Sequence, residues 1–151
     1  MGSFFSRTIP DNYVSPTPTP RGFQGTLNVP IVLLYSYIGT GFHGLQYNSG
    51  QLTIEKVLLD AIADAGLIPQ KSYLNLSRIK WKEASRTDVG VHAAAQVVSF
   101  RVSLVGDLKV RDVVPLISRY LPRDSPITVW KALSFSGAFN AQRYADGRNY
   151  Q

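Results

Sequence analysis

The sequence predicts an α+β domain of the ferredoxin-like class, with the order β-α-β-β-α-β, a four-stranded antiparallel sheet and two helices on one face. Two periodicities support this prediction, because four runs follow strand patterns and two runs repeat apolar residues at helical spacing. A chain of 151 residues, 44% of them hydrophobic, can also build one core. We expect the domain at residues 29–136, after a disordered or linker segment at residues 1–28 that holds Pro16, Pro18 and Pro20.

The first strand is predicted at residues 29–38, where the run from Ile31 to Tyr35 is almost continuously apolar. Such a run is typical of a strand with both faces covered, so we expect it to be central in the sheet. Gly39 to Gly44 then match the GxGxxG spacing of dinucleotide-binding loops, but no helical pattern follows directly. We therefore interpret these glycines as a flexible loop that permits close approach, and not as a nucleotide site.

The first helix is predicted to begin after Thr53 and to end before Gly66. Thr53 can accept a backbone hydrogen bond at the start, and glycine is the residue that most easily follows a helix end. The apolar residues of this segment recur at helical spacing, which predicts one buried face: Ile54, Val57, Leu58, Ala61, Ile62 and Ala65.

Two further strands are predicted on either side of a polar turn, at residues 78–85 and 95–102. In the first of them, three cations alternate with two apolar residues, so that Arg78, Lys80 and Lys82 would face solvent while Ile79 and Trp81 face the core. In the second, alternation separates two faces, one with Gln96, Val98, Phe100 and Val102 and the other with Val97, Ser99 and Arg101.

The second helix is predicted within residues 107–120, and the fourth strand at residues 127–135. Pro115 is compatible with a helix only in its first turn, unless the helix is kinked there. This favours a short helix with Asp112 as its cap. Its apolar stripe would consist of Val110, Val113, Val114, Ile117 and Leu121.

Charge and composition restrict the function classes. The chain has 16 Lys and Arg against 10 Asp and Glu, and its net charge of +6 has the sign expected of a polyanion binder, or of an ordinary basic protein. The absence of cysteine excludes disulfides, thiolate metal sites and a cysteine nucleophile. Because His43 and His92 are the only histidines, we predict no metal site. No apolar run approaches the roughly 20 residues that cross a bilayer, so we expect no membrane association.

The stretch from residue 84 to residue 100 is the strongest functional candidate. It is a polar turn followed by a strand, and the turn carries one carboxylate, Asp88, with Arg86 two residues before it and His92 four residues after it. We expect Asp88 to lie in an exposed turn close to a rigid sheet. Taken alone, an aspartate in a turn more often stabilises the turn than catalyses a reaction.

Three blocks of the sequence are distinctive in their residues and their order. They are Tyr37-x-Gly39-Thr40-x-Phe42-x-Gly44-Leu45-Gln46 with Thr53-Ile54-Glu55; Arg86-Thr87-Asp88 with Gly90-Val91-His92-Ala93 and Gln96-Val97-Val98-Ser99-Phe100; and Phe139-x-Ala141 with Arg148-x-Tyr150. In these blocks the chain resembles the tRNA pseudouridine synthase A family, from about residue 30 to residue 151, and three ordered blocks are far more specific than one motif. It departs from the family at Ser85 and Ala95, where many relatives carry glycine, at Val89, and at Leu45, where bacterial members usually carry tryptophan. Leu45 and Tyr47-Asn48 are most similar to eukaryotic members.

The resemblance implies an isomerase that converts uridine to pseudouridine in tRNA, in the region of the anticodon stem-loop, without a cofactor. It implies that Asp88 is the catalytic residue, as a nucleophile toward either the ribose or the base. It further implies that Arg86 holds the target nucleotide out of the stack and that Tyr150 stacks on the target base. Gln46 and Arg143 are implied RNA contacts.

The resemblance also implies how much of the enzyme is present. Residues 29–136 correspond to the N-terminal catalytic half-domain, and residues 137–151 to the start of the second, truncated half. We therefore expect the 151 residues to fold but to be inactive alone. A homodimer is possible for the full-length protein, and we expect an intracellular location, in the nucleus, the mitochondrion or the cytoplasm.

Two other classes of protein share the predicted fold. An RRM has the same element order and binds RNA bases on aromatic residues of its two central strands. The strands at residues 29–38 and 95–102 lack the corresponding aromatic run. A ferredoxin-like subunit with a purely structural role is the third interpretation.

Overall fold

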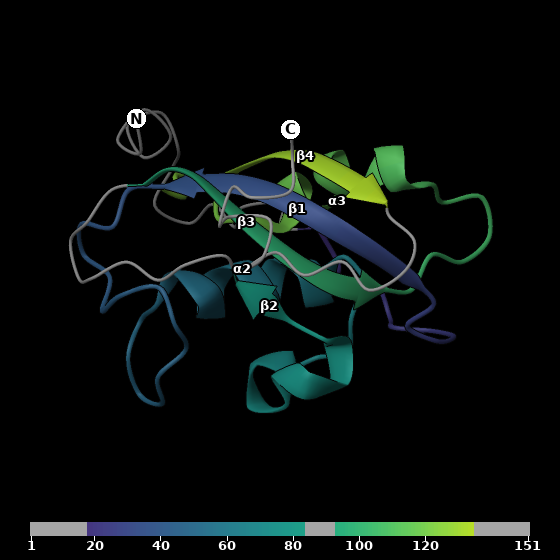
Figure 1. Cartoon of the computed structure of the whole chain (residues 1–151), viewed down its shortest axis with the longest axis horizontal. Helices are drawn as coiled ribbons and strands as arrows, with labels where there is room; N and C mark the ends of the chain where they lie inside the picture. Colours follow the sequence, from purple (N-terminus) through teal and green to yellow (C-terminus); the bar gives the residue numbers. More distant parts are fainter. Residues whose placement is uncertain (1–17, 84–92, 135–151) are drawn as a thin grey trace, which may run out of the picture.

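The computed structural model describes residues 18–83 and 93–134 and confirms the predicted element order (Figure 1). The elements are β1 (Val29–Tyr37), α2 (Ile54–Asp64), β2 (Lys82–Glu83), β3 (Ala93–Val102), α3 (Val113–Tyr120) and β4 (Ile127–Ser134). Three short 3₁₀ helices occur in the connections, η1 (Ser72–Leu74), η2 (Leu76–Ile79) and η3 (Val110–Asp112). Most of the expected linker, residues 1–17, and the expected start of a second half, residues 137–151, lie outside the described residues.

The strands form one antiparallel sheet in the order β2-β3-β1-β4, so β1 is central as predicted. Leu33 of β1 pairs with Val98 of β3 and with Ala132 of β4. The register on the β4 side shifts between Leu34 and Tyr35. Val32 is buried and Leu34 is half-buried on the face opposite to Ile31, Leu33 and Tyr35, so the apolar run of β1 is shielded on both faces.

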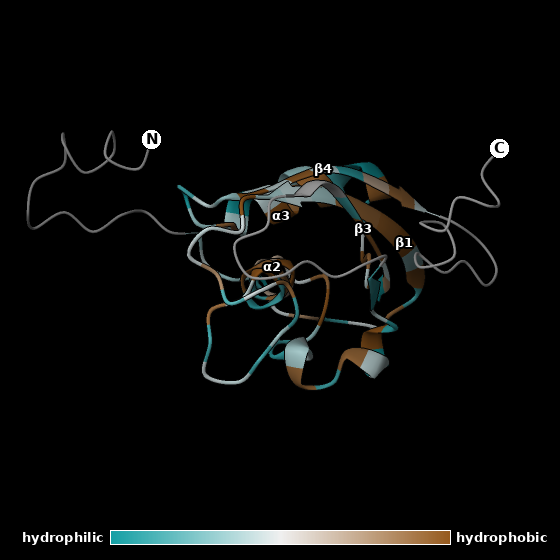
Figure 2. Cartoon of the chain, turned by 60° about the vertical axis from the view of Figure 1, so that its left-hand side comes forward, coloured by the Kyte–Doolittle hydropathy of each residue, from teal (hydrophilic) through white to brown (hydrophobic). Residues whose placement is uncertain are grey.

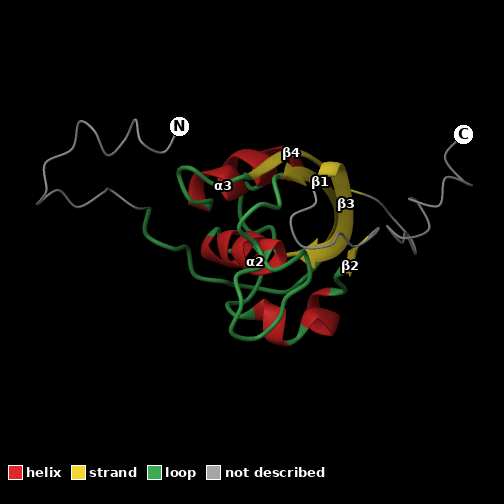
Figure 3. Cartoon of the chain, turned by 90° about the vertical axis from the view of Figure 1, so that its left-hand side faces the viewer, coloured by secondary structure: helices red, strands yellow, loops and turns green. Residues whose placement is uncertain are grey.

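Both long helices, α2 and α3, cover the same face of the sheet (Figure 3). Figure 2 shows hydrophobic residues along β1 and β3 and on α2. The alternation predicted for residues 96–102 is confirmed, because Gln96, Val98, Phe100 and Val102 are all buried. The core joins the helix-facing side chains of the strands to the apolar stripes of the helices, and includes Ile31, Leu33, Tyr35, Leu58, Ile62, Val98, Phe100, Val102, Val113 and Ile117.

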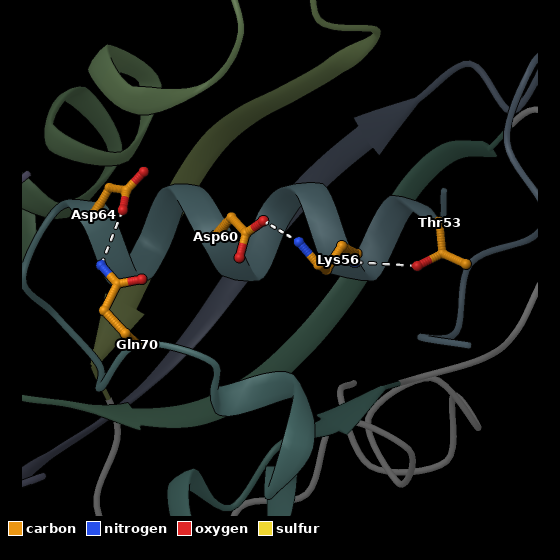
Figure 4. Close-up of polar contacts among 5 residues, drawn as sticks. All are labelled: Thr53, Lys56, Asp60, Asp64 and Gln70. Carbon is orange, nitrogen blue, oxygen red and sulfur yellow. Dashed lines mark hydrogen bonds and ion pairs between the residues drawn. The ribbon is translucent and has the colours of Figure 1, made fainter. Parts of the chain in front are cut away.

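Helix α2 begins and ends where the sequence predicts. The Thr53 hydroxyl accepts a hydrogen bond from the Lys56 backbone N–H at 3.2 Å, which satisfies one of the free donors at the helix start. Its exposed side carries an ion pair between Lys56 and Asp60, and Gln70 donates to Asp64 beyond the last turn at 2.9 Å (Figure 4). Charged contacts on one side and apolar packing on the other fix the orientation of the helix against the sheet.

Gly66 follows the helix with a φ of +81°, a conformation that side chains with a Cβ rarely adopt. A Cβ at this position would lie 3.0 Å from the Arg21 Cβ and 3.2 Å from the Gly22 carbonyl oxygen. We expect Gly66→Ala to lower the free energy of unfolding by about 2 kcal/mol or more, because it adds a contact to the backbone strain. Urea unfolding measures this value.

The matched control is Gly50→Ala, since Gly50 has a φ of +78° and no atom within 4 Å of the added Cβ. This variant carries the backbone strain alone and should cost about 1 kcal/mol. Equal losses in the two variants would show that the packing of residues 21–22 against the end of α2 does not contribute to stability.

The strand predicted at residues 78–85 is largely wrong. Residues 76–79 form η2, and Lys80 has a φ of +59°, so the chain reverses before the two-residue strand β2. The backbone N–H groups of Arg78 and Lys80 donate to Asn75 and Ser77, which are local partners and not a strand partner. The predicted distribution of side chains nevertheless holds, because Ile79 and Trp81 are buried while Arg78, Lys80 and Lys82 are exposed.

The second helix is short, as Pro115 predicts. Asp112 precedes α3 and Pro115 lies in its first turn, where the missing N–H is not needed. Asp112 does not cap α3 through its side chain, however. Its carboxylate accepts the Lys109 backbone N–H at 2.9 Å and so stabilises η3 instead.

Residues 18–28 contain no helix or strand, but hydrogen bonds attach them to the domain. The Arg21 N–H donates to the Asp64 carbonyl at 2.7 Å, and the Tyr120 hydroxyl donates to the Thr19 carbonyl at 2.8 Å. Within the part of the chain that the structure describes, no helix is long and apolar enough to span a membrane.

Candidate active site

Arg86, Asp88 and His92 belong to residues 84–92, which lie outside the described residues. The structure defines both ends of this segment. Glu83 is the last residue of β2, Ala93 is the first residue of β3, and the two strands are antiparallel neighbours. The predicted connection between the second and third strands is therefore the segment that carries Asp88.

Gln46 lies at the same end of the sheet as this segment. Tyr37, the last residue of β1, pairs with Ala93, so the loop that follows β1 and the segment before β3 leave the sheet side by side. Gln46 is exposed within that loop, next to the buried Leu45. Two backbone hydrogen bonds hold the loop on the start of α2, from Glu55 N–H to the Leu45 carbonyl and from Ile54 N–H to the Gly44 carbonyl.

Arg143 and Tyr150 fall within residues 135–151, outside the described residues, so the structure does not bring them to this end. The last described residue, Ser134, pairs with Ile31 near the other end of β1. Arg78, Lys80 and Lys82 are exposed before and in β2, on the approach to the Asp88 segment. A polyanion that reaches Asp88 from this side would meet these cations.

A buried acidic network lies between the loop of Gln46 and the end of β2. Glu55, which is 2% exposed, accepts hydrogen bonds from the Tyr47 backbone N–H at 2.7 Å and from the Trp81 indole Nε1 at 2.8 Å. The Tyr35 hydroxyl donates to the Glu83 carboxyl group, with 3.1 Å to each oxygen. Glu83 is half-buried as a residue because β2 is an edge strand, but its carboxyl group points inward to a ring that is 0% exposed.

The environment of this network favours the uncharged form of Glu83. Burial raises the pKa of Glu83 well above its ordinary value, and the nearby charge of Glu55 raises it further. Burial also raises the pKa of the Tyr35 hydroxyl, with the charge of Glu83 as the next cause. The site therefore holds two carboxyl groups whose mutual repulsion is relieved when one of them is protonated.

The sequence analysis missed this network. Glu55 belongs to one of the three sequence blocks, but the buried face predicted for the helix consists of apolar residues only. Glutamate is seldom fully buried without a partner, so the pattern gave no reason to place Glu55 there. For Glu83 a signal existed, since the alternation that turned Ile79 and Trp81 inward places residue 83 inward as well. A partner for each acid, Trp81 and Tyr35, could only be identified from the three-dimensional arrangement.

No family model matches the chain. The curated relatives include the Pseudouridylate synthase 1 homolog of Mus musculus, 37% identical over 123 residues, which are 80% of this chain and 27% of the mouse protein. The tRNA pseudouridine synthase 1 of Kluyveromyces lactis is 34% identical over 121 residues, 80% of this chain and 21% of that protein. The tRNA pseudouridine synthase 1 of Saccharomyces cerevisiae is 31% identical, with the same coverage.

These names define one class of protein, the pseudouridine synthases. The resemblance predicted from the motifs is confirmed, because proteins with these names are 31–37% identical to this chain over 80% of its length. A match over 80% of the chain necessarily includes its middle, and with it Arg86 and Asp88. The chain spans about a quarter of the length of the curated relatives it matches, with 27% of the mouse protein and 21% of the yeast protein covered.

Proposed function

We propose that this chain forms the Asp88-bearing part of a tRNA pseudouridine synthase. The observation that carries the proposal is the homology to proteins named tRNA pseudouridine synthase 1 over a region that includes the Asp88 motif. The position of that motif supports it, because the segment joins two strands at an end of the sheet that exposed cations approach. The proposed substrate is uridine in tRNA, in the anticodon stem-loop region, and the proposed location is inside the cell.

The proposed reaction is an isomerisation. The bond between the ribose and uracil N1 breaks, the base rotates, and the ribose is rejoined to uracil C5. The C5 hydrogen is released as a proton, and N1 takes up a proton from the solvent. Atoms and electrons balance without a redox partner, so the reaction needs a well-placed nucleophile and no cofactor. An aspartate has an ordinary pKa of about 3.9 and is ionised at neutral pH, so the carboxylate of Asp88 can add to the ribose or to the base.

The other proposed site residues bind the RNA. Arg86 is placed two residues before Asp88, where a planar cation can contact phosphate and replace part of the stacking lost by the flipped nucleotide. Tyr150 would stack on the target base, and Gln46 and Arg143 would contact the RNA backbone. Arg78, Lys80 and Lys82 supply a diffuse attraction for phosphate.

The comparisons do not favour the RRM alternative, because the relatives are named as synthases. The orientation of the aromatic residues opposes it as well. An RRM presents aromatic rings of its central strands to RNA on the open face of the sheet. Here Tyr35, Tyr37 and Phe100 are buried in the core cluster that the helices cover. Among the described side chains of β1 and β3, the positions on the open face carry no aromatic ring.

Release of tritium from tRNA that contains 5-tritiated uridine tests the proposal, because the C5 hydrogen is lost in the reaction. We expect release by a longer synthase that contains this chain, and little or no release by the 151 residues alone, which cover about a quarter of the relatives. A longer protein that binds tRNA but releases no tritium from any uridine would refute the proposed function. Mapping of pseudouridine in the product then identifies the modified position.

A further inference from the structure

The proposed reaction uses neither of the two glutamates of the chain, Glu55 and Glu83. Both are nevertheless held in the interior, where an acidic side chain is costly unless it is paired. Glu83 is five residues before Asp88, and Glu55 binds the residue next to Gln46. Glu83 is therefore the last described residue before the Asp88 segment, and Glu55 holds the loop that carries Gln46.

The hydrogen bonds of the two acids involve α2, the Gln46 loop, the segment before β2, β2 itself and β1. Glu55 belongs to α2 and holds the Gln46 loop through the Tyr47 N–H and the segment before β2 through Trp81. Glu83 belongs to β2 and is held by Tyr35 of the central strand. Glu55 also lies close enough to Glu83 for its charge to raise the pKa of the Glu83 carboxyl group, so the two acids belong to one network. Tyr47 also packs on Tyr73, with 4.6 Å between ring centroids, which fixes the loop from its other side.

The donors around the two acids differ. Each Glu55 oxygen accepts an N–H group. Glu83 accepts the Tyr35 hydroxyl at 3.1 Å, and two carboxyl groups can share a hydrogen bond only when one of them is protonated. Among the described residues, the groups that act on the Glu83 carboxyl group are Glu55 of α2, Tyr35 of β1 and Trp81 before β2, and none of these is a cation. A proton on Glu83 therefore relieves the repulsion between the two acids, in agreement with the raised pKa of Glu83.

We propose that Glu55 and Glu83 together form a positioning unit, which fixes the residue from which the Asp88 segment departs relative to the loop that carries Gln46. The proposal rests on the proposed function. Glu83 touches no substrate in this arrangement and acts through the backbone that leads to Asp88. Loss of the Glu83 proton leaves two negative charges close together in the interior, which weakens the attachment of Glu83.

The first measurement is the pH dependence of stability. The folded form raises the pKa of Glu83, so its contribution to stability is complete below the pKa of the unfolded chain and is lost as the pH rises through the folded value. We expect the urea midpoint of the wild-type chain to fall more between about pH 5 and about pH 8 than that of Glu83→Gln, which keeps the hydrogen bonds and does not titrate. Asp124→Asn, at an exposed carboxylate, is the control and should follow the wild type.

The second measurement is single-turnover tritium release in the longer synthase. Because a misplaced reacting group costs up to about a hundredfold in rate, we expect Glu83→Ala to lower the rate about tenfold to a hundredfold, with the tRNA Kd changed less than about threefold. Glu83→Gln should restore most of the rate, and its rate should decline less above neutral pH than that of the wild type.

The outcomes separate the two proposals. If Glu83→Ala lowers only the urea midpoint, while the turnover rate and its pH profile match the wild type, the pair is structural and the inference fails although the proposed function stands. If the wild-type synthase releases no tritium, the proposed function itself fails. Equal pH dependence of the urea midpoints for the wild type and Glu83→Gln would show that Glu83 carries no additional proton in the folded chain.

Discussion

Replacing Asp88 by asparagine should abolish pseudouridine formation in a longer synthase that contains this chain, with at least about a thousandfold loss of rate, as expected for removal of a nucleophile. Asparagine has nearly the same size as aspartate and can keep the hydrogen bonds of a turn, but its amide is not a nucleophile. We expect the tRNA Kd to stay within about threefold of the wild type, because Arg86 and the exposed cations, which we propose as the RNA-binding residues, are unchanged. Tritium release and filter binding measure the two quantities.

The Asp88 prediction also separates the enzyme from a structural ferredoxin-like subunit. If Asp88 only stabilised its turn, asparagine would be a mild replacement, and alanine would lower the urea midpoint without affecting a rate. Asp107→Asn is the matched control, since Asp107 is an exposed acid beyond Val102, at the end of β3 opposite to the Asp88 segment. Wild-type rates for Asp88→Asn would exclude a nucleophilic role, whatever its effect on stability.

Most of the fold could be predicted because its elements are long and their periodicity is unambiguous. β1, α2 and β3 lie within one or two residues of their predicted ranges, since each has to bury a complete face. Residues 78–85 show the limit of this reasoning. Burial of Ile79 and Trp81 is compatible with a strand, and equally with a helical turn that ends in a reversal, so alternation over a few residues could not distinguish them.

The candidate site could be predicted only in part. Asp88 and Arg86 were identified through a motif, and the structure adds that the Gln46 loop leaves the sheet beside their segment. The pair of Glu55 and Glu83 could not be found in this way, because its members are 28 positions apart in the sequence and no local pattern connects them. Their common environment arises only when the segment of Trp81 and Glu83 folds next to the first turn of α2, which local patterns do not report.

The largest expected effect on stability is that of Phe100→Ala. Phe100 is 1% exposed on the helix-facing side of β3, opposite Ile31 of β1, and its ring lies 4.9 Å from that of Trp81 between centroids. Truncation of a fully buried phenylalanine leaves a cavity in addition to the lost burial, so we expect a loss of about 3–5 kcal/mol in the free energy of unfolding. Urea unfolding followed by far-UV circular dichroism measures it, because this signal does not depend on tryptophan.

The effect of Phe100→Ala should extend to the acidic network, since Trp81 lies between the Phe100 ring and Glu55. Without the Phe100 ring, the Trp81 ring should hold Glu55 less firmly. When Phe100 is alanine, we therefore expect Glu83→Gln to change the pH dependence of the urea midpoint less than it does when Phe100 is present.

Leu74→Ala is the control, because Leu74 is 65% exposed and its truncation should change the free energy of unfolding by less than about 0.5 kcal/mol. If Phe100→Ala lowered stability but left the pH dependence intact, the aromatic packing and the carboxyl pair would be independent, and the position of Glu83 would depend on Tyr35 and α2 alone.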